Sequence, residues 1–194
     1  MNPRTRLFAT LAAAVAALGI AAVLYGINRP DVHASGTPPA VLDKLKMAED
    51  AAAAPEASFA DAAGKIVKLA DFKGRYVLLN MWATWCGPCI TELPELAKLK
   101  SALPEDRMTV VPVDLLERLG PDKIGEFLKM HDAEGLPVFI DSERATLRGF
   151  AANELPLTVL IDDQGRVIAR AAGAQKWADP EAVAYFKALS AKKS

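Results

Sequence analysis

Residues that commonly hold metal ions are scarce in this sequence. The 194 residues include two cysteines, Cys86 and Cys89, and two histidines, His33 and His131. A structural zinc site needs four ligands, and one Cys-x-x-Cys pair supplies two of them. Because His33 lies in a polar, extended stretch and His131 on a predicted helix, the sequence argues against a structural zinc site. We expect no metal and no other cofactor.

Clusters of like charge are also missing. Lysine and arginine total 23, aspartate and glutamate total 24, and the formal net charge is -1. The basic residues are scattered, whereas binding to nucleic acid or to an acidic membrane surface usually requires a basic cluster, so neither is predicted. With 52% hydrophobic residues, the chain is long enough for one domain with a core, plus extra sequence at one end.

The extra sequence lies at the N-terminus. Arg4 and Arg6 precede a run without charged residues, Leu7 to Ile27. About 21 apolar residues can span the hydrocarbon core of a bilayer, and positive charge in front of them keeps that end in the cytoplasm. The sequence therefore predicts an uncleaved, single-pass anchor in the inner (cytoplasmic) membrane, with the remainder of the chain in the periplasm.

Two alternatives stay open for this N-terminal segment. The small residues around His33 suit signal peptidase, so that cleavage after Ala34 would release the exported chain from the membrane. A buried helix of a cytoplasmic protein is the other alternative, although residues 28–39 have the polar composition of a tether. We expect residues 1–27 to be the cytoplasmic tip and anchor, 28–56 a tether with a short helix, and 57–194 the folded domain.

Hydrophobic periodicity predicts an α/β domain. Strands are expected at 76–82, 109–113, 136–140, 157–161 and 167–171, the last two as a hairpin, with another hairpin over 59–69. Helices are expected within the alanine-rich stretch 39–54, at 88–103 with a bend at Pro94, from Pro121, at 142–150, and from Pro180 with Asp179 as N-cap. This order of elements is typical of a mixed central sheet flanked by helices on both faces.

The cysteine pair follows the predicted strand 76–82 and opens the next helix. A disulfide that closes so short a loop removes little chain entropy, so it would be a poor structural staple. At a helix start, unpaired amides and the helix dipole stabilise a thiolate, which is the form that attacks disulfides. Cys89, one turn into the helix, is close enough to react with Cys86 and release a bound partner. The placement therefore predicts a redox pair, with Cys86 as nucleophile and Cys89 as resolving thiol.

The sequence around the pair also resembles a known family. Trp85-Cys86-Gly87-Pro88-Cys89 matches the thioredoxin active site, with Pro94 five residues further on. A wider stretch, 64–94, and the proline strand 156–162 resemble the membrane-anchored TlpA and ResA branch of thioredoxin-like proteins. The resemblance covers about residues 57–190. It implies a thioredoxin-like fold and a thiol:disulfide oxidoreductase, specifically a protein-disulfide reductase.

The resemblance implies further site residues. Pro156 corresponds to a proline whose preceding peptide bond, from Leu155, is cis in this fold and whose neighbours pair with the substrate backbone. Glu92 matches an acidic residue suited to exchange protons with the resolving thiol, the alternative being a solvated helix carboxylate. Asn80 stands where ordinary thioredoxins have a buried aspartate, which favours Glu92 or water as the proton acceptor. Trp85 is expected to offer an apolar docking surface.

The expected contacts of the remaining residues are simpler. Gly87 and Pro88, which lie between the cysteines, are expected to contact the substrate. Trp82 is expected to be a core residue, and His131 a surface residue of a helix. The Gly-Pro dipeptide is that of thioredoxin, which favours a reductase over a strong oxidant.

Partners follow from the resemblance. It implies disulfide-containing periplasmic clients, namely apocytochrome c or proteins that assemble the copper centres of cytochrome oxidase, and a membrane thiol transporter as electron donor. Two other functions are alternatives. A copper metallochaperone is disfavoured by the close cysteine spacing and the scarcity of histidine, and a thiol peroxidase needs its reactive cysteine in a different setting.

Overall fold

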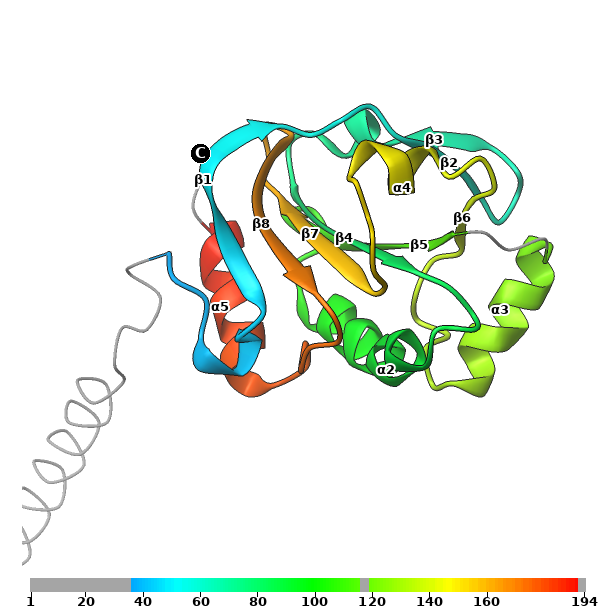
Figure 1. Cartoon of the computed structure of the whole chain (residues 1–194). Helices are drawn as coiled ribbons and strands as arrows, with labels where there is room; N and C mark the ends of the chain where they lie inside the picture. The colour runs from blue at the N-terminus through cyan, green and yellow to red at the C-terminus, as the bar shows by residue number, and fades with distance from the viewer. Residues whose placement is uncertain (1–35, 116–118, 192–194) are drawn as a thin grey trace, which may run out of the picture. The chain divides into compact units, whose positions relative to one another are not determined.

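The computed structural model describes residues 36–115 and 119–191, which form a sheet with helices packed against it (Figure 1). The predicted anchor, 7–27, and most of the predicted tether lie outside the described residues. Within the described ranges, no helix has both the length and the apolar character that crossing a membrane requires.

All eight strands of the described residues belong to one mixed sheet, in the order β1-β8-β7-β4-β5-β6-β2-β3. Their bounds are β1 Leu45–Ala53, β2 Ser58–Asp61, β3 Ile66–Lys68, β4 Tyr76–Trp82, β5 Met108–Leu115, β6 Phe139–Asp141, β7 Leu157–Ile161 and β8 Arg166–Ala172. The central strand β4 runs parallel to β5 and antiparallel to β7. The carboxyl end of β4 therefore lies beside the amino end of β7.

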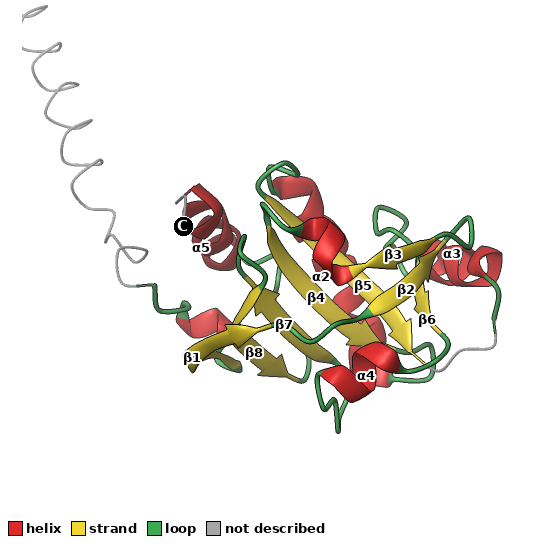
Figure 2. Ribbon diagram, turned by 90° about the horizontal axis from the view of Figure 1, so that it is seen from above, coloured by secondary structure: helices red, strands yellow, loops and turns green. Residues whose placement is uncertain are grey.

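Helices cover both faces of the sheet (Figures 1 and 2). The helical segments are η1 Ala40–Leu42, η2 Leu69–Phe72, α2 Gly87–Ala102, α3 Pro121–Met130, α4 Ala145–Gly149 and α5 Pro180–Ala191. The side chains of α2, α3 and α5 share one core cluster, and those of η2 and α4 share a second with the opposite face of the sheet. The predicted mixed sheet with helices on both faces is confirmed.

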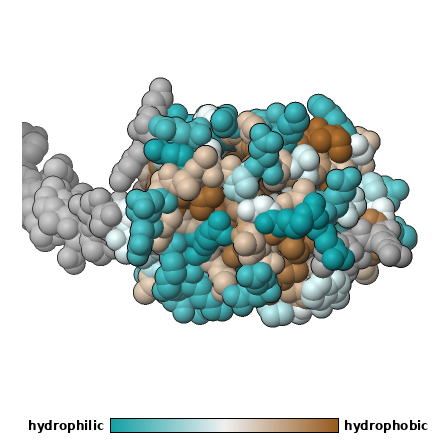
Figure 3. Space-filling view, turned by 45° about the horizontal axis from the view of Figure 1, so that its top comes forward, coloured by the Kyte–Doolittle hydropathy of each residue, from teal (hydrophilic) through white to brown (hydrophobic). Residues whose placement is uncertain are grey.

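Strand β4 shows why these residues form the centre of the sheet. Every residue of β4 is buried, as expected for a short, nearly continuous apolar run with layers on both sides. Successive side chains point to opposite faces, so Leu78 and Trp82 join the cluster with α2, whereas Val77 and Leu79 join the cluster with η2. On the face drawn in Figure 3, hydrophobic side chains form small patches separated by hydrophilic ones.

The prediction of a helix within residues 39–54 is wrong. Only the single turn η1 is helical there, and the chain then continues as β1, which pairs antiparallel with β8. Alanine favours helices, but the edge of β8 offers a row of backbone partners, and tertiary pairing overrides a local preference of this size. The sheet therefore begins before residue 57, the boundary that the sequence predicts for the domain.

Other elements differ from the prediction at their ends. Strand β6 starts at Phe139, three residues later than expected, and α4 starts at Ala145. The Asp141 carboxylate accepts hydrogen bonds from the backbone N–H groups of Ala145 and Thr146, which satisfies the first amides of α4. The predicted cap of α5 is confirmed, because Asp179 Oδ1 accepts from the Glu181 N–H at 2.9 Å.

Candidate active site

Cys86 and Cys89 lie at the carboxyl end of the central strand. Strand β4 ends at Trp82, Cys86 is the N-cap of α2, and Cys89 lies in the first turn of that helix. The two sulfur atoms form a disulfide, with 5.2 Å between the Cα atoms. The structure is thus that of the oxidised protein.

The helix start provides the electrostatic environment of Cys86. Its Sγ accepts a hydrogen bond from the Cys89 N–H at 3.3 Å, one of the amides that have no partner within α2. This contact and the positive end of the helix dipole stabilise negative charge on Cys86 when the pair is reduced. Cys86 is 6% exposed and Cys89 is 0% exposed, so Cys86 is the sulfur that a partner can reach.

Pro156 lies at the same edge of the sheet. The Leu155–Pro156 peptide bond is cis, and Pro156 immediately precedes β7. Because β7 pairs antiparallel with β4 and Leu157 lies opposite Met81, Pro156 reaches the end of β4 from which the cysteine loop departs. Leu155 is half-buried and packs against both core clusters. The structure therefore brings the predicted proline segment and the cysteines to one edge.

The other residues predicted to contact a client lie next to the cysteines in the sequence, and they differ in exposure to solvent. Trp85 is 64% exposed, and Gly87 and Pro88 are exposed in the first turn of α2. Trp82 is 1% exposed and stacks on Phe127, with 5.8 Å between the ring centroids, which confirms the prediction of a core residue.

His131 lies at the end of a helix, as the sequence predicts, and is partly covered by a neighbouring ring. It caps α3 and is half-buried, with its ring centroid 4.5 Å from that of Phe127. Among the described residues, no group of three or more His, Cys, Asp or Glu side chains is arranged to hold a metal ion.

Glu92 is a buried carboxylate rather than a solvated one. Its side chain is on α2, one turn beyond Cys89 and on the same helix face. Glu92 is 1% exposed, and its Oε1 accepts a hydrogen bond from Asn80 Nδ2 at 2.7 Å. Its Oε2 accepts from Trp177 Nε1 at 2.7 Å and from the Gln175 N–H at 3.2 Å. The alternative of a solvated helix carboxylate is therefore wrong.

Burial sets the acidity of this carboxylate. Desolvation raises the pKa of Glu92 from 4.5 to about 7, while its hydrogen bonds with Trp177, Asn80 and the Gln175 N–H act in the opposite direction. A group with a pKa close to neutral exchanges protons readily in either direction, which is the property of a general acid or base. Glu92 therefore combines a place one turn along α2 from Cys89 with a pKa close to neutral.

Asn80 connects this carboxylate to the sheet. Its Nδ2 also donates to Thr158 Oγ1 at 2.9 Å, and Asn80 and Thr158 lie opposite each other on β4 and β7. A buried polar row therefore runs from Glu92 across β4 to the strand that follows Pro156.

Trp177 and Gln175 are the residues that sequence reasoning missed. Both lie between β8 and α5, more than 80 positions from Glu92 along the chain. A buried tryptophan is ordinarily a core residue, and only the contact of its indole N–H reveals a polar role. No spacing pattern in the sequence links these two residues to the cysteines.

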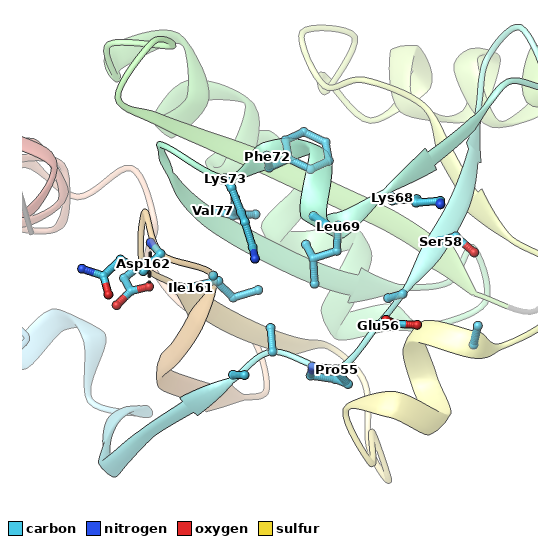
Figure 4. A pocket seen from close by; sticks show the side chains of 17 residues that line it. Pro55, Glu56, Ser58, Lys68, Leu69, Phe72, Lys73, Val77, Ile161 and Asp162 are labelled. Atoms are coloured by element: carbon cyan, nitrogen blue, oxygen red, sulfur yellow. Dashed lines mark hydrogen bonds between the residues drawn. The ribbon is translucent and has the colours of Figure 1, made fainter.

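A cavity of about 650 Å³ lies elsewhere in the molecule (Figure 4). Its lining includes Val77 and Ile161, which lie at the amino end of β4 and the carboxyl end of β7, opposite to the cysteines. None of the predicted site residues lines this cavity. The candidate active site therefore lies away from this cavity and is identified by its reactive groups.

Comparison with known proteins gives consistent matches. Residues 51–170, called the matched region below, match the model of the AhpC/TSA family. The chain is 33% identical over 133 residues to the thiol-disulfide oxidoreductase ResA of Bacillus thuringiensis subsp. konkukian, covering 69% of this chain and 73% of that relative. It is 34% identical over 117 residues to ResA of Bacillus subtilis, covering 59% of this chain and 63% of that relative.

A solved structure is also similar. The thiol:disulfide interchange protein DsbE of Chlorobium tepidum is 29% identical, with a TM-score of 0.57. The similarity covers 74% of this chain and 94% of that protein.

Proposed function

The chain belongs to the AhpC/TSA family and is a thioredoxin-fold thiol-disulfide oxidoreductase, and we propose that it reduces specific disulfides of extracytoplasmic proteins while anchored in the inner membrane. The observation that supports this proposal is the Cys86–Cys89 disulfide at the start of α2, next to Pro156 and above a buried carboxylate. In the proposal, the catalytic residues are Cys86, Cys89 and Glu92.

The first step is attack by the Cys86 thiolate on one sulfur of the client disulfide. A bond forms between Cys86 Sγ and that sulfur, the client S–S bond breaks, and the other client sulfur leaves as a thiolate. The backbone N–H of Cys89 donates a hydrogen bond to Cys86 Sγ in the oxidised protein, and in the reduced protein it stabilises the attacking thiolate. The product of this step is a mixed disulfide.

In the second step Cys89 resolves the mixed disulfide. Glu92 takes the Cys89 proton, and the Cys89 thiolate attacks Cys86 Sγ, which expels the second client sulfur as a thiolate. The client has then gained two electrons, and the protein has lost two by forming the Cys86–Cys89 disulfide. The two client thiolates take up protons from Glu92 and from solvent. A thiol donor must afterwards reduce the protein disulfide for another cycle.

In the proposal, the residues beside the two cysteines bind the client. Trp85 offers a largely exposed indole, Gly87 and Pro88 are exposed beside the sulfurs, and Leu155 precedes the buried Pro156. The backbone next to the cis peptide bond pairs with an extended client segment, and the indole supplies apolar contact area. Together these residues present the client disulfide to Cys86.

The direction of electron flow follows from the dipeptide between the cysteines. Gly87-Pro88 is the thioredoxin dipeptide, and thioredoxin is a reductant with a potential of about -270 mV. The periplasm oxidises cysteine pairs, so a reductase there requires electrons from the cytoplasm. We propose that a membrane thiol transporter supplies them, and that the clients are apocytochrome c or proteins that assemble the copper centres of cytochrome oxidase.

The place of action follows from the N-terminal sequence. In the proposal, the apolar run 7–27 behind Arg4 and Arg6 acts as a single-pass anchor, and residues 28–39 act as a tether. Anchoring confines the site to the surface of the membrane and raises its effective concentration toward membrane-bound partners.

Two measurements test the proposed function. The potential of the Cys86/Cys89 pair, equilibrated with glutathione buffers, should lie near that of thioredoxin, and a potential near -120 mV, the approximate value for DsbA, would contradict a reductase. Full-length Cys89→Ser expressed in membranes should accumulate mixed disulfides with its clients, because resolution is blocked. The double variant Cys86→Ser with Cys89→Ser is the matched control and should trap nothing.

A further inference from the structure

The carboxylate of Glu92 is held in part by residues outside the matched region. Both donors to Glu92 Oε2, the Trp177 indole N–H and the Gln175 backbone N–H, lie beyond residue 170. They belong to the segment 173–179, which joins β8 to α5 and is called the β8–α5 connection below. A part of the chain that the family model does not cover therefore contacts the proposed proton acceptor.

Several contacts hold the β8–α5 connection in place. The Ala178 N–H donates to Glu95 Oε2 at 3.1 Å, one turn along α2 from Glu92. Trp177 is 0% exposed and its ring lies 6.1 Å from that of Phe186, between centroids. These contacts hold the connection against the helix that carries the cysteines, so the indole N–H has a fixed direction toward the carboxylate.

Lys44 joins this arrangement from the other end of the chain. Its Nζ donates to the Ala174 carbonyl of the connection at 3.4 Å. Lys44 precedes β1 and also lies outside the matched region. A pocket of about 510 Å³ separates η1, α2 and the connection, and its lining includes Lys44, Glu92 and Gln175. The buried carboxylate and a lysine thus line the same pocket.

We propose that Trp177 and Lys44 are positioning residues for Glu92, the indole by donating a hydrogen bond to the carboxylate and the ammonium as a positive charge on the lining of the same pocket. This inference rests on the proposed function, in which Glu92 takes the Cys89 proton. A carboxylate without these two groups would stay protonated at higher pH and would accept that proton less readily.

Few charged side chains line the pocket beside Glu92. From the turn before β1, Asp43 and Lys44 line the pocket, Lys176 does so from the β8–α5 connection, and Glu95 does so from α2 itself. Strands β4 and β7 present the neutral side chains of Asn80 and Thr158. Lys44 is the cation that acts to lower the pKa of Glu92, after the hydrogen bonds from Trp177, Asn80 and the Gln175 N–H.

The contact with Trp177 is tested by NMR on the full-length chain. The indole N–H cross-peak of Trp177, identified by its loss in Trp177→Phe, should move between about pH 5 and pH 9 with a midpoint near that of Glu92. The movement should disappear in Glu92→Gln. The indoles of Trp82 and Trp85 are internal controls and should not follow this titration. A Trp177 cross-peak that does not move would overturn the assignment.

This measurement does not depend on catalysis, so it separates the inference from the proposed function. If Glu92→Gln exchanges disulfides as fast as the wild type, the proton role of Glu92 fails, while a titrating indole still establishes the positioning contact. If the Trp177 indole cross-peak does not titrate but Glu92→Gln exchanges disulfides slowly, the proton role of Glu92 stands and the positioning role of Trp177 is wrong.

Kinetics test the effect of the two residues on exchange. Fully reduced full-length protein is mixed with saturating oxidised glutathione, at which resolution by Cys89 is the slow step, and the rate is followed against pH. Lys44→Met should move the midpoint of the profile to higher pH by a few tenths of a unit, because Lys44 is exposed and screened by solvent. Trp177→Phe should move it by about one unit, because a hydrogen bond to a charged group is lost.

Matched variants make the kinetic result decisive. Lys44→Arg keeps the cation and should restore the wild-type profile, and Lys46→Met removes a neighbouring exposed cation that does not line the pocket. Trp177 is buried and its substitution removes core contacts, so the exposed Lys44 provides a test that does not depend on the folding of Trp177→Phe. Superimposable profiles for the wild type and Lys44→Met would overturn the role of Lys44.

Discussion

The two ends of the central strand β4 differ in what they hold. At the amino end lies the cavity of about 650 Å³, whose lining is assembled from β4, β7, η2 and the chain that leads into β2. At the carboxyl end lie the Cys86–Cys89 disulfide and the cis bond before Pro156, with a pocket of about 510 Å³ beside Glu92. The end with the smaller pocket has the reactive groups.

Two buried carboxylates show the same difference. Asp162, near the amino end of β4, is 3% exposed and accepts hydrogen bonds from backbone N–H groups and from Arg166, whose guanidinium also lies 2.7 Å from it as an ion pair. Glu92, near the carboxyl end, is 1% exposed, and its three hydrogen bonds come from neutral groups. At Asp162 a guanidinium contacts the buried carboxylate, whereas at Glu92 burial raises the pKa and the neutral donors oppose this rise only in part.

The largest effect is expected from Cys86→Ser. A hydroxyl does not form a disulfide, so the oxidation of the protein by glutathione disulfide should stop and leave only the uncatalysed rate. The measurement is the single-turnover assay with the full-length reduced protein. Residual exchange through Cys89 alone, at more than a small fraction of the wild-type rate, would mean that the two thiols have interchangeable roles.

Glu92→Gln should have the next largest effect. General acid or base catalysis contributes at least about 100-fold, so the rate of resolution at pH 7 should fall by about that factor, and its pH dependence near neutrality should flatten. Glu95→Gln, one turn along the same helix, removes a charge but keeps a side-chain oxygen that can accept from the Ala178 N–H, so this matched control should stay within about twofold of the wild type. Equal losses in both variants would show that only the net charge of α2 matters.

The pKa of Glu92 also predicts how stability depends on pH. Its pKa is raised to about 7 in the folded protein from 4.5, so its contribution to stability is complete below pH 4.5 and is lost as the pH rises through 7. At about 1.4 kcal/mol for each pH unit, the loss is about 3 kcal/mol. Denaturant unfolding at both ends of this range should show it in the oxidised wild type but not in Glu92→Gln. A similar pH dependence in both would contradict the assignment.

The smallest effect on exchange is expected at the opposite end of β4. Leu69→Ala enlarges the amino-end cavity and should lower the free energy of unfolding by about 2 kcal/mol, because a buried side chain is lost. The exchange rate with glutathione disulfide should remain within about twofold of the wild type under conditions in which the variant is folded. A large loss of exchange would show that the two ends of the strand are coupled, and the contrast between them would then fail.

Much of the fold could be predicted from the sequence, because its signals are local. The continuous apolar run of β4, the helix that starts after the cysteines and the Asp179 cap each depend on neighbouring residues. The failure at 39–54 has the same cause. An alanine-rich segment favours a helix by itself, and only the backbone of β8 beside it makes β1 a strand.

The chemistry of the site divides in the same way. The sequence by itself determined the redox pair and the residues that flank it, because a Cys-x-x-Cys motif at a strand-to-helix junction specifies both the reacting groups and their electrostatic environment. Tertiary structure alone decided the surroundings of Glu92. Asn80 comes from β4, Trp177 from the β8–α5 connection and Lys44 from the turn before β1, and only packing removes the carboxylate from water and places those groups around it. Burial and long-range hydrogen bonds, which set the acidity of Glu92, have no local pattern in the sequence.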